Sequence, residues 1–569
     1  MKNNHGTVSN IRYALKLIWT CSPHYLLWEI VYGILLGIWG SAAVVFTQIF
    51  YNALFEDGDF PEILRIVGVM LILTVLYQFW SQWYTSVFRP KMRARLQYGV
   101  NRILFEKNAE LDLDCYNNPE FYNDFVWAMG EATDRVYAVM DSLSRLLGGT
   151  FQHVLAFVIS SGVMASVSPV LAIVAVLTSI MHIVLQRFWI KSDLKRKLAL
   201  TPLNRKNAYY ESLFNTPDYA KDMRTSRVSE ILSEKYTENQ KQIKDTHIKY
   251  NSKLLKYIIP FNLLSGIMQP IVYGILFYQI IVQKTLGMAS LAVAFTAFWS
   301  LRYRIQGVID LFLKYSQHGL YIGQIRKYMS YCSAVRFGDI TAPSFQSMEL
   351  KNVSFGYVPG KTVLSNISMK INRGEKIAIV GYNGAGKSTL INLLLHLYNP
   401  EQGEILYNGK SIEEFDSASI HSRIGVVLQD YRIFALPLSE NVLRDKFEES
   451  DESRIRYALE NACFESKLQT LPDGICSEMT KEFYKDGVNL SGGESQKVAI
   501  SRIFASPFDV IIMDEPSAAL DPKAEHDLSI NLAKHAKGKT VIIISHRLST
   551  TCAMDKIYMF DGGKIIEEG

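Results

Sequence analysis

The sequence predicts a multi-domain membrane protein, in which an N-terminal all-α domain of six membrane-spanning helices precedes a C-terminal α/β domain. The chain has 569 residues, enough for two or more domains, and 49% of them are hydrophobic. The apolar excess lies before about residue 315, in runs long enough to cross a bilayer. After about residue 346, short β-branched runs alternate with helical stretches, a pattern typical of an α/β domain.

Six apolar runs predict the membrane-spanning helices. They lie near residues 25–52, 62–88, 146–167, 169–189, 256–282 and 286–313. Pro169 falls between the third and fourth runs, where it suits a tight reversal of the chain. We therefore expect these two helices to form a hairpin.

The positions of Lys and Arg predict the orientation in the membrane. The short loop 55–62 contains neither, whereas the segments that follow the second and fourth spans are rich in both. By the positive-inside rule, the N-terminus, the C-terminus and both long loops lie in the cytoplasm. The expected location is the cell (cytoplasmic) membrane, which the chain crosses several times.

The two long loops are about 60 residues each and are predicted to continue the spans as helices. Segments 114–124 and 218–232 lie within them. The first contains Tyr116, Phe121 and Tyr122, with Phe125 just beyond it. So many aromatic side chains favour docking onto another domain, although a solvated, charged stalk is the simpler alternative.

Three charged residues of the sixth span are unusual for a membrane segment. Burial of Arg302, Arg304 and Asp310 against lipid would be costly. Two interpretations are open: the three residues line a central aqueous pathway, or they pair with one another or extend toward the headgroups.

Net charge and cysteine spacing exclude some classes of protein. The net charge of +5 comes with basic residues placed in loops between apolar runs, so we expect no nucleic-acid partner. The six cysteines show no CxxC spacing, which argues against a zinc site or a disulfide framework.

A domain boundary is predicted where the hydrophobic density falls. Residues 1–323 form the membrane domain, 324–346 a linker, and 347–569 the α/β domain. Four strands are predicted in the latter, at Lys376–Val380, Gly425–Leu428, Val510–Met513 and Val541–Ile544.

A phosphate-binding loop follows the first of these strands. The run Gly381, Tyr382, Asn383, Gly384, Ala385, Gly386, Lys387, Ser388 fits GxxxxGK[ST], and Thr389 continues it into a helix. The glycines let several backbone N–H groups converge on phosphate oxygens at the helix N-terminus. Lys387 is expected to reach the β- and γ-phosphates of ATP, and Ser388 to bind Mg²⁺.

Two acidic residues end the strand Val510–Met513. The carboxyl end of a parallel strand beside the P-loop is where an α/β sheet binds its ligand. Asp514 is expected to hold Mg²⁺, directly or through water, and Glu515 to polarise the attacking water.

A second phosphate-binding surface is predicted at LSGGE, Leu490–Glu494. Ser491 and Glu494 have the spacing of a helix capping box. Ser491, Gly492 and Gly493 could also present donors to a γ-phosphate at the N-terminus of the next helix. Because the chain already has a P-loop, this surface makes most sense against the ATP of a partner chain.

With these motifs in view, the chain resembles an exporter-type half-transporter of the ATP-binding cassette (ABC) family, with the membrane domain first. The resemblance implies that Tyr357 stacks on adenine and that Gln429, the Q-loop glutamine, touches Mg²⁺ and water. It further implies that Ser517–Asp521 is the D-loop, that His546 contacts the γ-phosphate, and that 114–124 and 218–232 hold the coupling helices.

The resemblance also implies ATP-driven export by alternating access, with ATP hydrolysed at two sites between two ATPase domains. The partner is a second half-transporter; a homodimer is favoured because no motif is degenerate, and a heterodimer stays open. The cargo is expected to be an amphipathic small molecule such as a drug, a lipid or a peptide. The alternative function is an ATP-gated channel or a regulatory membrane ATPase.

One residue departs from the family pattern. Glu494 stands where family members usually have Gln. A carboxylate that faced a triphosphate would repel it, so we expect Glu494 to cap its own helix.

Overall fold

The computed structural model describes residues 6–57, 60–117, 121, 125, 133–216, 219–333, 335, 337–358, 360–516, 520–545 and 554–569. The chain divides into two compact units. The first contains Met1–Glu106 and Val126–Met329, and the second contains Lys107–Phe125 and Ser330–Gly569.

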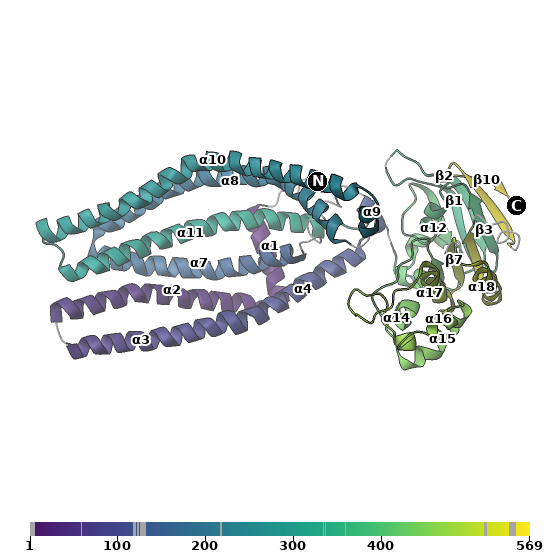
Figure 1. Ribbon diagram of the computed structural model, residues 1–569, viewed down its shortest axis with the longest axis horizontal. Coiled ribbons are helices and arrows are strands. Elements are labelled where there is room, and N and C mark those ends of the chain that lie inside the picture. Colours follow the sequence, from purple (N-terminus) through teal and green to yellow (C-terminus); the bar gives the residue numbers. More distant parts are fainter. Residues whose placement is uncertain are drawn as a thin grey trace. The chain divides into compact units, whose positions relative to one another are not determined.

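The first unit is helical (Figure 1). Its described elements are α1 (Thr7–Cys21), α2 (Pro23–Asn52), η1 (Ala53–Asp57), α3 (Phe60–Trp83), η2 (Tyr84–Phe88), α4 (Arg89–Glu110, which continues into the second unit), α7 (Thr133–Val167), α8 (Pro169–Asn215), α9 (Ala220–Thr225), α10 (Val228–Phe277), η4 (Tyr278–Val282) and α11 (Met288–Met329). The predicted helical continuations of the spans are confirmed, because α4, α8 and α10 each extend far beyond an apolar run. The predicted break before Pro169 is also confirmed: α7 ends at Val167, and α8 begins at Pro169.

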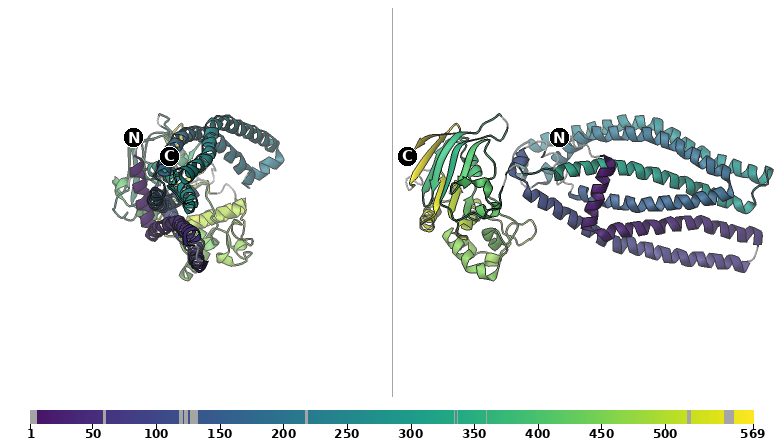
Figure 2. Two further views of the ribbon diagram at one scale, coloured as in Figure 1. Left: turned by 90° about the vertical axis from the view of Figure 1, so that its left-hand side faces the viewer. Right: turned by 180° about the vertical axis from the view of Figure 1, so that it is seen from behind.

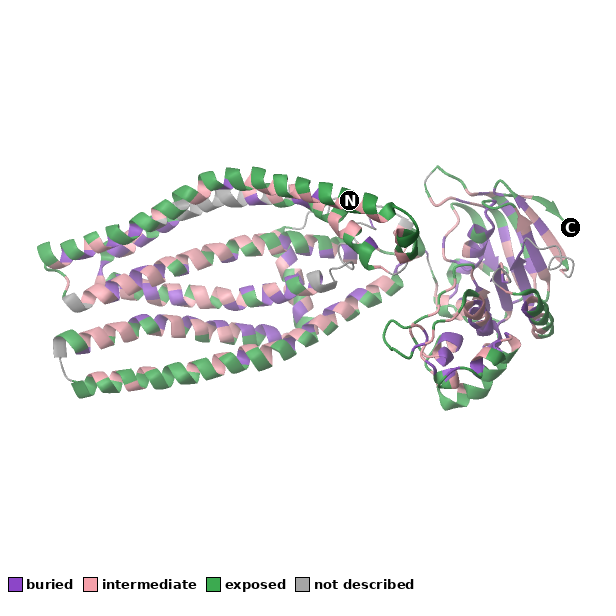
Figure 3. Cartoon of the chain, viewed as in Figure 1, coloured by how far each residue is buried: buried purple, intermediate pink, exposed green. Residues whose placement is uncertain are grey.

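Among the described residues, four helical stretches are long and apolar enough to cross a membrane. They are Pro23–Phe55, Phe60–Glu110, Val136–Val167 and Val228–Val282. The other two predicted spans fall in α8, where Pro169–Ile180 is a shorter apolar helix, and in α11. Helix α3 has no buried residue in its described length, and Figure 3 shows it mostly exposed, with some residues of intermediate exposure. Its apolar surface therefore needs lipid or protein to cover it.

Charged side chains join three helices of the first unit. Glu29 of α2 is 2% exposed and accepts two hydrogen bonds from Arg89, at 2.7 and 3.0 Å. Tyr84 donates to the same carboxylate. On α7, buried Asp141 pairs with Arg93 of α4 at 3.1 Å. These paired charges fix α2 and α7 against α4.

The second unit contains two sheets. Its described elements are α5 (Leu113–Asn117), β1 (Ser347–Phe355), β2 (Leu364–Asn372), β3 (Lys376–Gly381), α12 (Lys387–Leu394), β4 (Gln402–Tyr407), β5 (Lys410–Ser411), η5 (Ile412–Glu414), α13 (Ser417–His421), β6 (Ile424–Val427), α14 (Leu438–Leu443), η6 (Glu449–Asp451), α15 (Glu452–Asn461), α16 (Glu465–Leu468), η7 (Gly474–Cys476), α17 (Gly492–Phe504), β7 (Val510–Asp514), α18 (Pro522–His535), β8 (Thr540–Ile544), β9 (Lys556–Asp561) and β10 (Lys564–Glu568). In the described part, one sheet has the order β2-β1-β4-β5 and the other the order β10-β9-β3-β8-β7-β6. All four predicted strands are confirmed as β3, β6, β7 and β8.

The larger sheet is parallel from β9 to β6 and is buried on both faces. Alternate residues of β7 point to opposite sides: Ile512 belongs to one hydrophobic cluster, and Ile511 and Met513 belong to another. Figure 2 shows the sheet from behind with helices beside it. Ile379 of β3 lies opposite Ile544 of β8, and Ile544 lies opposite Asp514 of β7, so these strands end at one edge.

Asp112 and Phe121 pack against residues of the predicted linker, 324–346, within the second unit. The Asp112 carboxylate accepts hydrogen bonds from Ser333 Oγ at 2.8 Å and from the Val335 N–H at 2.9 Å. Phe121 is fully buried, and its ring meets Tyr331 edge-on at 4.9 Å. An acidic and an aromatic side chain thus anchor this part of the chain to residues 331–335.

Candidate functional site

The P-loop connects β3 to α12. Gly384 and Gly386 have φ angles of 83° and 98°, a conformation that side chains with Cβ disfavour. A Cβ atom on Gly386 would lie 2.6 Å from Leu364 Cδ2, so a larger residue would also have to displace that side chain. The loop ends at the N-terminus of α12, where backbone N–H groups are available to an anion.

Lys387 lies across this loop. Its Nζ donates to the carbonyl oxygens of Gly381 at 2.9 Å and Tyr382 at 2.8 Å, and the residue is 7% exposed. Burial lowers the pKa of Lys387, while the charges of Glu515 and Asp514 oppose that shift. The ammonium group is therefore within electrostatic reach of both carboxylates.

Ser388 and Asp514 are directly hydrogen-bonded. Ser388 Oγ donates to Asp514 Oδ2 at 2.9 Å, although the two residues are 126 positions apart. The shared edge of β3, β8 and β7 brings them together. Burial raises the pKa of Asp514, and the hydrogen bond from Ser388 opposes this shift.

Glu515 follows β7 in a constrained conformation. Its φ is 48°, in the left-handed region that non-glycine residues rarely adopt, and such strain often marks a functional site. Its N–H donates to Ile544 O at 3.0 Å, and its carboxylate accepts from Gln429 Nε2 at 3.5 Å. The structure thus brings together Gln429 and Glu515, both of which the sequence predicted.

Tyr357 packs beside the P-loop helix. Its hydroxyl donates to Thr389 Oγ1 at 3.2 Å and accepts from Asn392 at 3.3 Å. Its ring meets Tyr398 edge-on at 5.3 Å. The tyrosine is therefore oriented by hydrogen bonds at one end and by an aromatic neighbour at the other.

The LSGGE segment, Leu490–Glu494, which we call the signature turn, leads into α17. Ser491 is the N-cap, and Glu494 completes a capping box: Ser491 N donates to Glu494 Oε2 at 2.7 Å, and Glu494 N donates to Ser491 Oγ at 3.3 Å. Lys467 pairs with the other carboxylate oxygen at 3.2 Å. Burial opposes ionisation of Glu494, but hydrogen bonds from Ser491 and Lys467 hold its pKa below the usual range. The expectation that Glu494 caps its own helix is confirmed.

The signature turn stays at the surface of the chain. Ser491 and Gly492 are exposed, and Gly493 is half-buried. Within the described residues, the hydrogen bonds of this turn connect it to α17, Lys467 and Tyr431, whose hydroxyl donates to Gly492 O at 3.0 Å. The turn is thus supported by its own surroundings and remains accessible to another molecule.

Some predicted site residues lie outside the described residues. They are His546, residues 517–519 of the predicted D-loop, Asp218, and residues 118–120 and 122–124 of the first predicted coupling helix.

Two contacts at the site were not predicted from the sequence. Gln496 of α17 is buried and donates to the Glu515 carbonyl at 3.3 Å, so α17 supports the turn that follows β7. Asn392 holds Tyr357. A polar residue on the inward face of a helix next to a motif is the only signal that could have indicated either contact.

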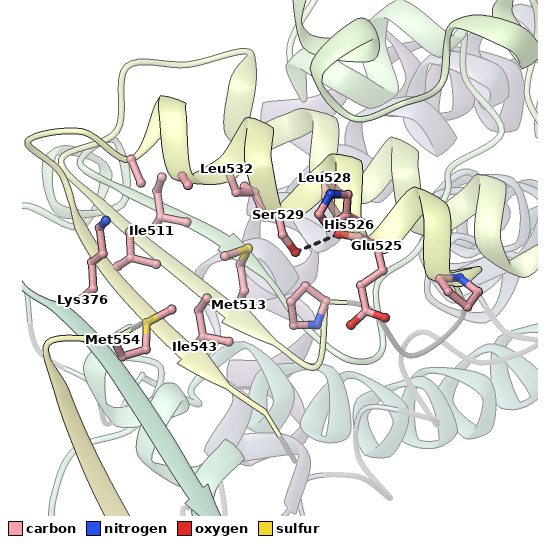
Figure 4. A pocket seen from close by; sticks show the side chains of 15 residues that line it. Lys376, Ile511, Met513, Glu525, His526, Leu528, Ser529, Leu532, Ile543 and Met554 are labelled. Atoms are coloured by element: carbon pink, nitrogen blue, oxygen red, sulfur yellow. Dashed lines mark hydrogen bonds between the residues drawn. The ribbon is translucent and has the colours of Figure 1, made fainter. Parts of the chain in front are cut away.

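A separate cavity of about 410 Å³ lies between α18 and strands β7 and β8. Figure 4 shows its largely apolar wall, in which Met513 and Ile543 face Leu528 and Leu532. Its lining contains no residue of the P-loop or the signature turn. The cavity is therefore distinct from the phosphate-binding loop.

Comparisons with known proteins give the family. The sequence pattern of the ABC transporter domain matches residues 364–518. The chain is 25% identical to the subtilin transport ATP-binding protein SpaT of Bacillus subtilis, over 98% of this chain and 90% of that protein. It is 36% identical to the putative multidrug export ATP-binding/permease protein YgaD of Bacillus subtilis (strain 168), but only over 39% of this chain and 38% of that protein.

A solved structure gives the fold of the whole chain. A bacterial Atm1-family ABC exporter with ATP bound has a TM-score of 0.75 and 22% identity, over 96% of this chain and 95% of that chain. At this identity the likeness shows the fold alone. The family pattern, the full-length relative and the fold agree: the chain belongs to the ABC transporters, as a helical membrane domain fused to an ATPase domain that couples ATP hydrolysis to transport.

Proposed function

We propose that two half-transporters, most simply two copies of this chain, export an amphipathic cargo across the cytoplasmic membrane by alternating access. The observation that supports this proposal best is the convergence of Ser388, Asp514, Glu515 and Gln429 at one sheet edge, while the signature turn remains exposed elsewhere. One chain thus presents one half of a hydrolytic site and, separately, a surface of hydrogen-bond donors for the ATP of a neighbouring chain.

In this proposal each ATP lies between two chains. One chain contributes Tyr357, the P-loop, Gln429, Asp514, Glu515 and His546, and the other contributes Ser491, Gly492 and Gly493. The inter-chain phosphate contacts form only when the ATPase domains close, so ATP shifts the population toward the closed state. Segments 114–124 and 218–232 transmit the closure to the membrane domain, and hydrolysis resets it.

Mg²⁺ fits the residues present. Ser388 Oγ and Asp514 Oδ2 lie 2.9 Å apart and are both oxygen donors, the ligands that Mg²⁺ prefers. Together with Gln429 they would hold the ion, which would supply positive charge to neutralise the transferred phosphoryl group. Lys387 neutralises further phosphate charge, Glu515 orients and deprotonates the attacking water, and His546 contacts the γ-phosphate.

The names of the relatives support a proposal for the cargo class. The relative that matches over the full length is described as a subtilin transporter, and shorter matches include an ATP-dependent lipid A-core flippase and a leukotoxin translocation protein. We propose an amphipathic peptide, lipid or drug. Both termini lie in the cytoplasm in this proposal.

The proposal is tested in proteoliposomes. ATPase activity and ATP-dependent movement of label are measured across a panel of peptides, lipids and hydrophobic compounds, with Glu515→Gln as the inactive control. Stimulation of the ATPase by a cargo that also accumulates on the far side supports export. Flux that is equal in wild-type protein and Glu515→Gln would instead identify an ATP-gated channel.

A further inference from the structure

Arg304 of α11 is buried among three packed helices of the membrane domain, α2, α7 and α11, which lie side by side in Figures 1 and 2. The residue is only 8% exposed, and its Nε atom is buried with no hydrogen-bond partner among the described residues. A buried guanidinium N–H without an acceptor is costly in a membrane domain, and an additional accepting group at this position would satisfy it.

A second basic residue, His153 of α7, lies close to Arg304 and also has a buried nitrogen atom without a partner. Its Nδ1 atom makes no hydrogen bond in the described part of the chain. Its ring lies 6.0 Å from the ring of Tyr303, and the Arg304 guanidinium carbon lies 5.5 Å from the same ring. Tyr303 is 64% exposed, so this pair of bases lies beside a residue at the surface of the unit.

Two glycines on neighbouring helices make room for these side chains. A Cβ atom on Gly40 of α2 would lie 2.3 Å from Arg304 Nη2. A Cβ atom on Gly307 of α11 would lie 2.2 Å from His153 Nδ1. Any larger residue at position 40 or 307 would displace the side chain of Arg304 or His153. Glycine at these two positions therefore leaves room for both side chains.

The acids of these helices whose side chains are described have other partners. Glu29 is bound by Arg89, and Asp141 by Arg93 and Arg145. Asp310 accepts a hydrogen bond from Gln306, one turn along its own helix. The charges that act on His153 are Arg304, Asp310 and Lys314, which leaves a local excess of positive charge.

We propose that Arg304 and His153 form a binding site, between α2, α7 and α11, for the carboxylate or phosphate group of an anionic amphipathic cargo. Arg304 donates charge-assisted hydrogen bonds to the anion, and His153 supplies a second donor. In this site the apolar part of the cargo extends outward past the exposed ring of Tyr303. The inference rests on the proposed export function and narrows its cargo to molecules with an acidic group.

The test measures binding without nucleotide, in nanodiscs of phosphatidylcholine. The probe is 11-bromoundecanoate, whose bromine quenches tryptophan fluorescence, and 11-bromoundecanol is the neutral probe of equal length. Saturable quenching by the carboxylate, with only non-saturable quenching by the alcohol, is the expected result for wild-type protein. Arg304→Gln should weaken carboxylate binding by about tenfold or more, the size of one charge-assisted hydrogen bond.

Three further variants separate binding from folding. Arg302 lies on the same helix, but its guanidinium lies over the ring of Trp299 at 5.0 Å. Arg302→Gln should leave the affinity for the carboxylate probe within about twofold of wild type. That change is much smaller than the one caused by losing a charge-assisted hydrogen bond. Arg304→Lys should retain most of the binding because it keeps the charge. Gly40→Ala should weaken binding while Arg304 is intact, because the new methyl group displaces the guanidinium.

The outcomes distinguish this inference from the export proposal. Equal affinity of wild-type protein and Arg304→Gln for the carboxylate, with basal Mg-ATPase intact in both, overturns the binding site and leaves the exporter standing. Displacement of the probe when phosphatidylglycerol is added to the nanodiscs would assign the site to a bilayer lipid and overturn its assignment to cargo.

Discussion

At the scale of single residues, the proposed function gives Glu515 the most direct chemical role. Its carboxylate lies beside Gln429 and follows the strand that holds Asp514. We expect Glu515→Gln to bind ATP normally and to lose about 10²–10⁴-fold in turnover, as removal of a general base does. Steady-state phosphate release and filter binding of labelled ATP measure the two quantities.

Glu494→Gln is the matched control for that variant. Glutamine still accepts a hydrogen bond from the Ser491 N–H, so the capping box is kept. Turnover within about twofold of wild type is expected, because a cap contributes about 1 kcal/mol of stability and no chemistry. A loss as large as that of Glu515→Gln would show that Glu494 takes part in hydrolysis.

His396 predicts a pH dependence of stability. It is 1% exposed, and burial lowers its pKa to about 4, partly offset by the contact of Nε2 with Asn399. Because this pKa is below the usual value of about 6.5, the unfolded state binds the proton more readily, and stability is lost as pH falls from 6.5 toward 4. The loss is roughly 3 kcal/mol.

Thermal unfolding of the purified protein at pH 7 and pH 4.5 tests this expectation. His396→Asn is the informative variant, because asparagine tolerates the φ of 51° at this position and does not titrate. The variant should lose less stability on acidification than wild type does. An equal loss in both proteins would place the sensitivity at other groups.

At the scale of elements, the N-terminus of α17 combines two roles of Ser491. The side chain caps the helix, and in the proposed function it also faces a partner's triphosphate. Ser491→Ala should lower the free energy of unfolding by about 1 kcal/mol and reduce ATPase activity. Ser491→Asp should keep the cap, since Asp and Ser are comparable caps, and yet reduce ATPase activity through charge repulsion.

Melting temperature and ATPase activity, measured together on both variants, separate the two roles. A fully active and stable Ser491→Asp would mean that the turn does not face phosphate.

The pairing of Glu29 with Arg89 ties α2 to the start of α4. Arg89 also lies over the ring of Tyr32 at 4.8 Å. Arg89→Met leaves the buried Glu29 carboxylate without its partner, and we expect the free energy of unfolding to fall by about 3–5 kcal/mol. The double variant with Glu29→Met should recover part of the loss in thermal unfolding, whereas additive losses would contradict a direct pair.

The sequence predicts elements much better than it predicts their contacts. The predicted strands and the P-loop are local patterns, and the structure contains those strands at β3, β6, β7 and β8. The bonds Glu29–Arg89 and Gln496–Glu515 join residues that no periodicity relates. Helix α1 was not predicted either; it is too short to span a bilayer and is fixed by long-range contacts such as Asn10 Nδ2 to Gly319 O at 2.8 Å.

The residues of the site also divide into those that local motifs predict and those that only the folded packing brings together. Motif spacing predicts Lys387, Ser388, Asp514 and Glu515 as site residues, because phosphate chemistry restricts which residues can serve, and the structure places Ser388 within hydrogen-bond distance of Asp514. The support given by Asn392 and Gln496 depends on the three-dimensional packing of α12 and α17, which one sequence does not reveal.

At the scale of the whole molecule, the proposed function requires two chains around each nucleotide. The P-loop and the signature turn of one chain then serve different ATP molecules. In the proposed function, closure of the ATPase domains by ATP drives the membrane domain, so a nucleotide shared by two chains is the central claim.

Cross-linking tests that claim most directly. Asn383→Cys and Ser491→Cys are introduced together in the Glu515→Gln protein and treated with a short bismaleimide, with each single cysteine variant as the control for the native thiols. The account predicts a covalent dimer that forms with Mg-ATP, is much weaker without it, and is absent from both controls. Cross-linking that yields no dimer above the controls at saturating Mg-ATP would contradict a nucleotide held between two chains.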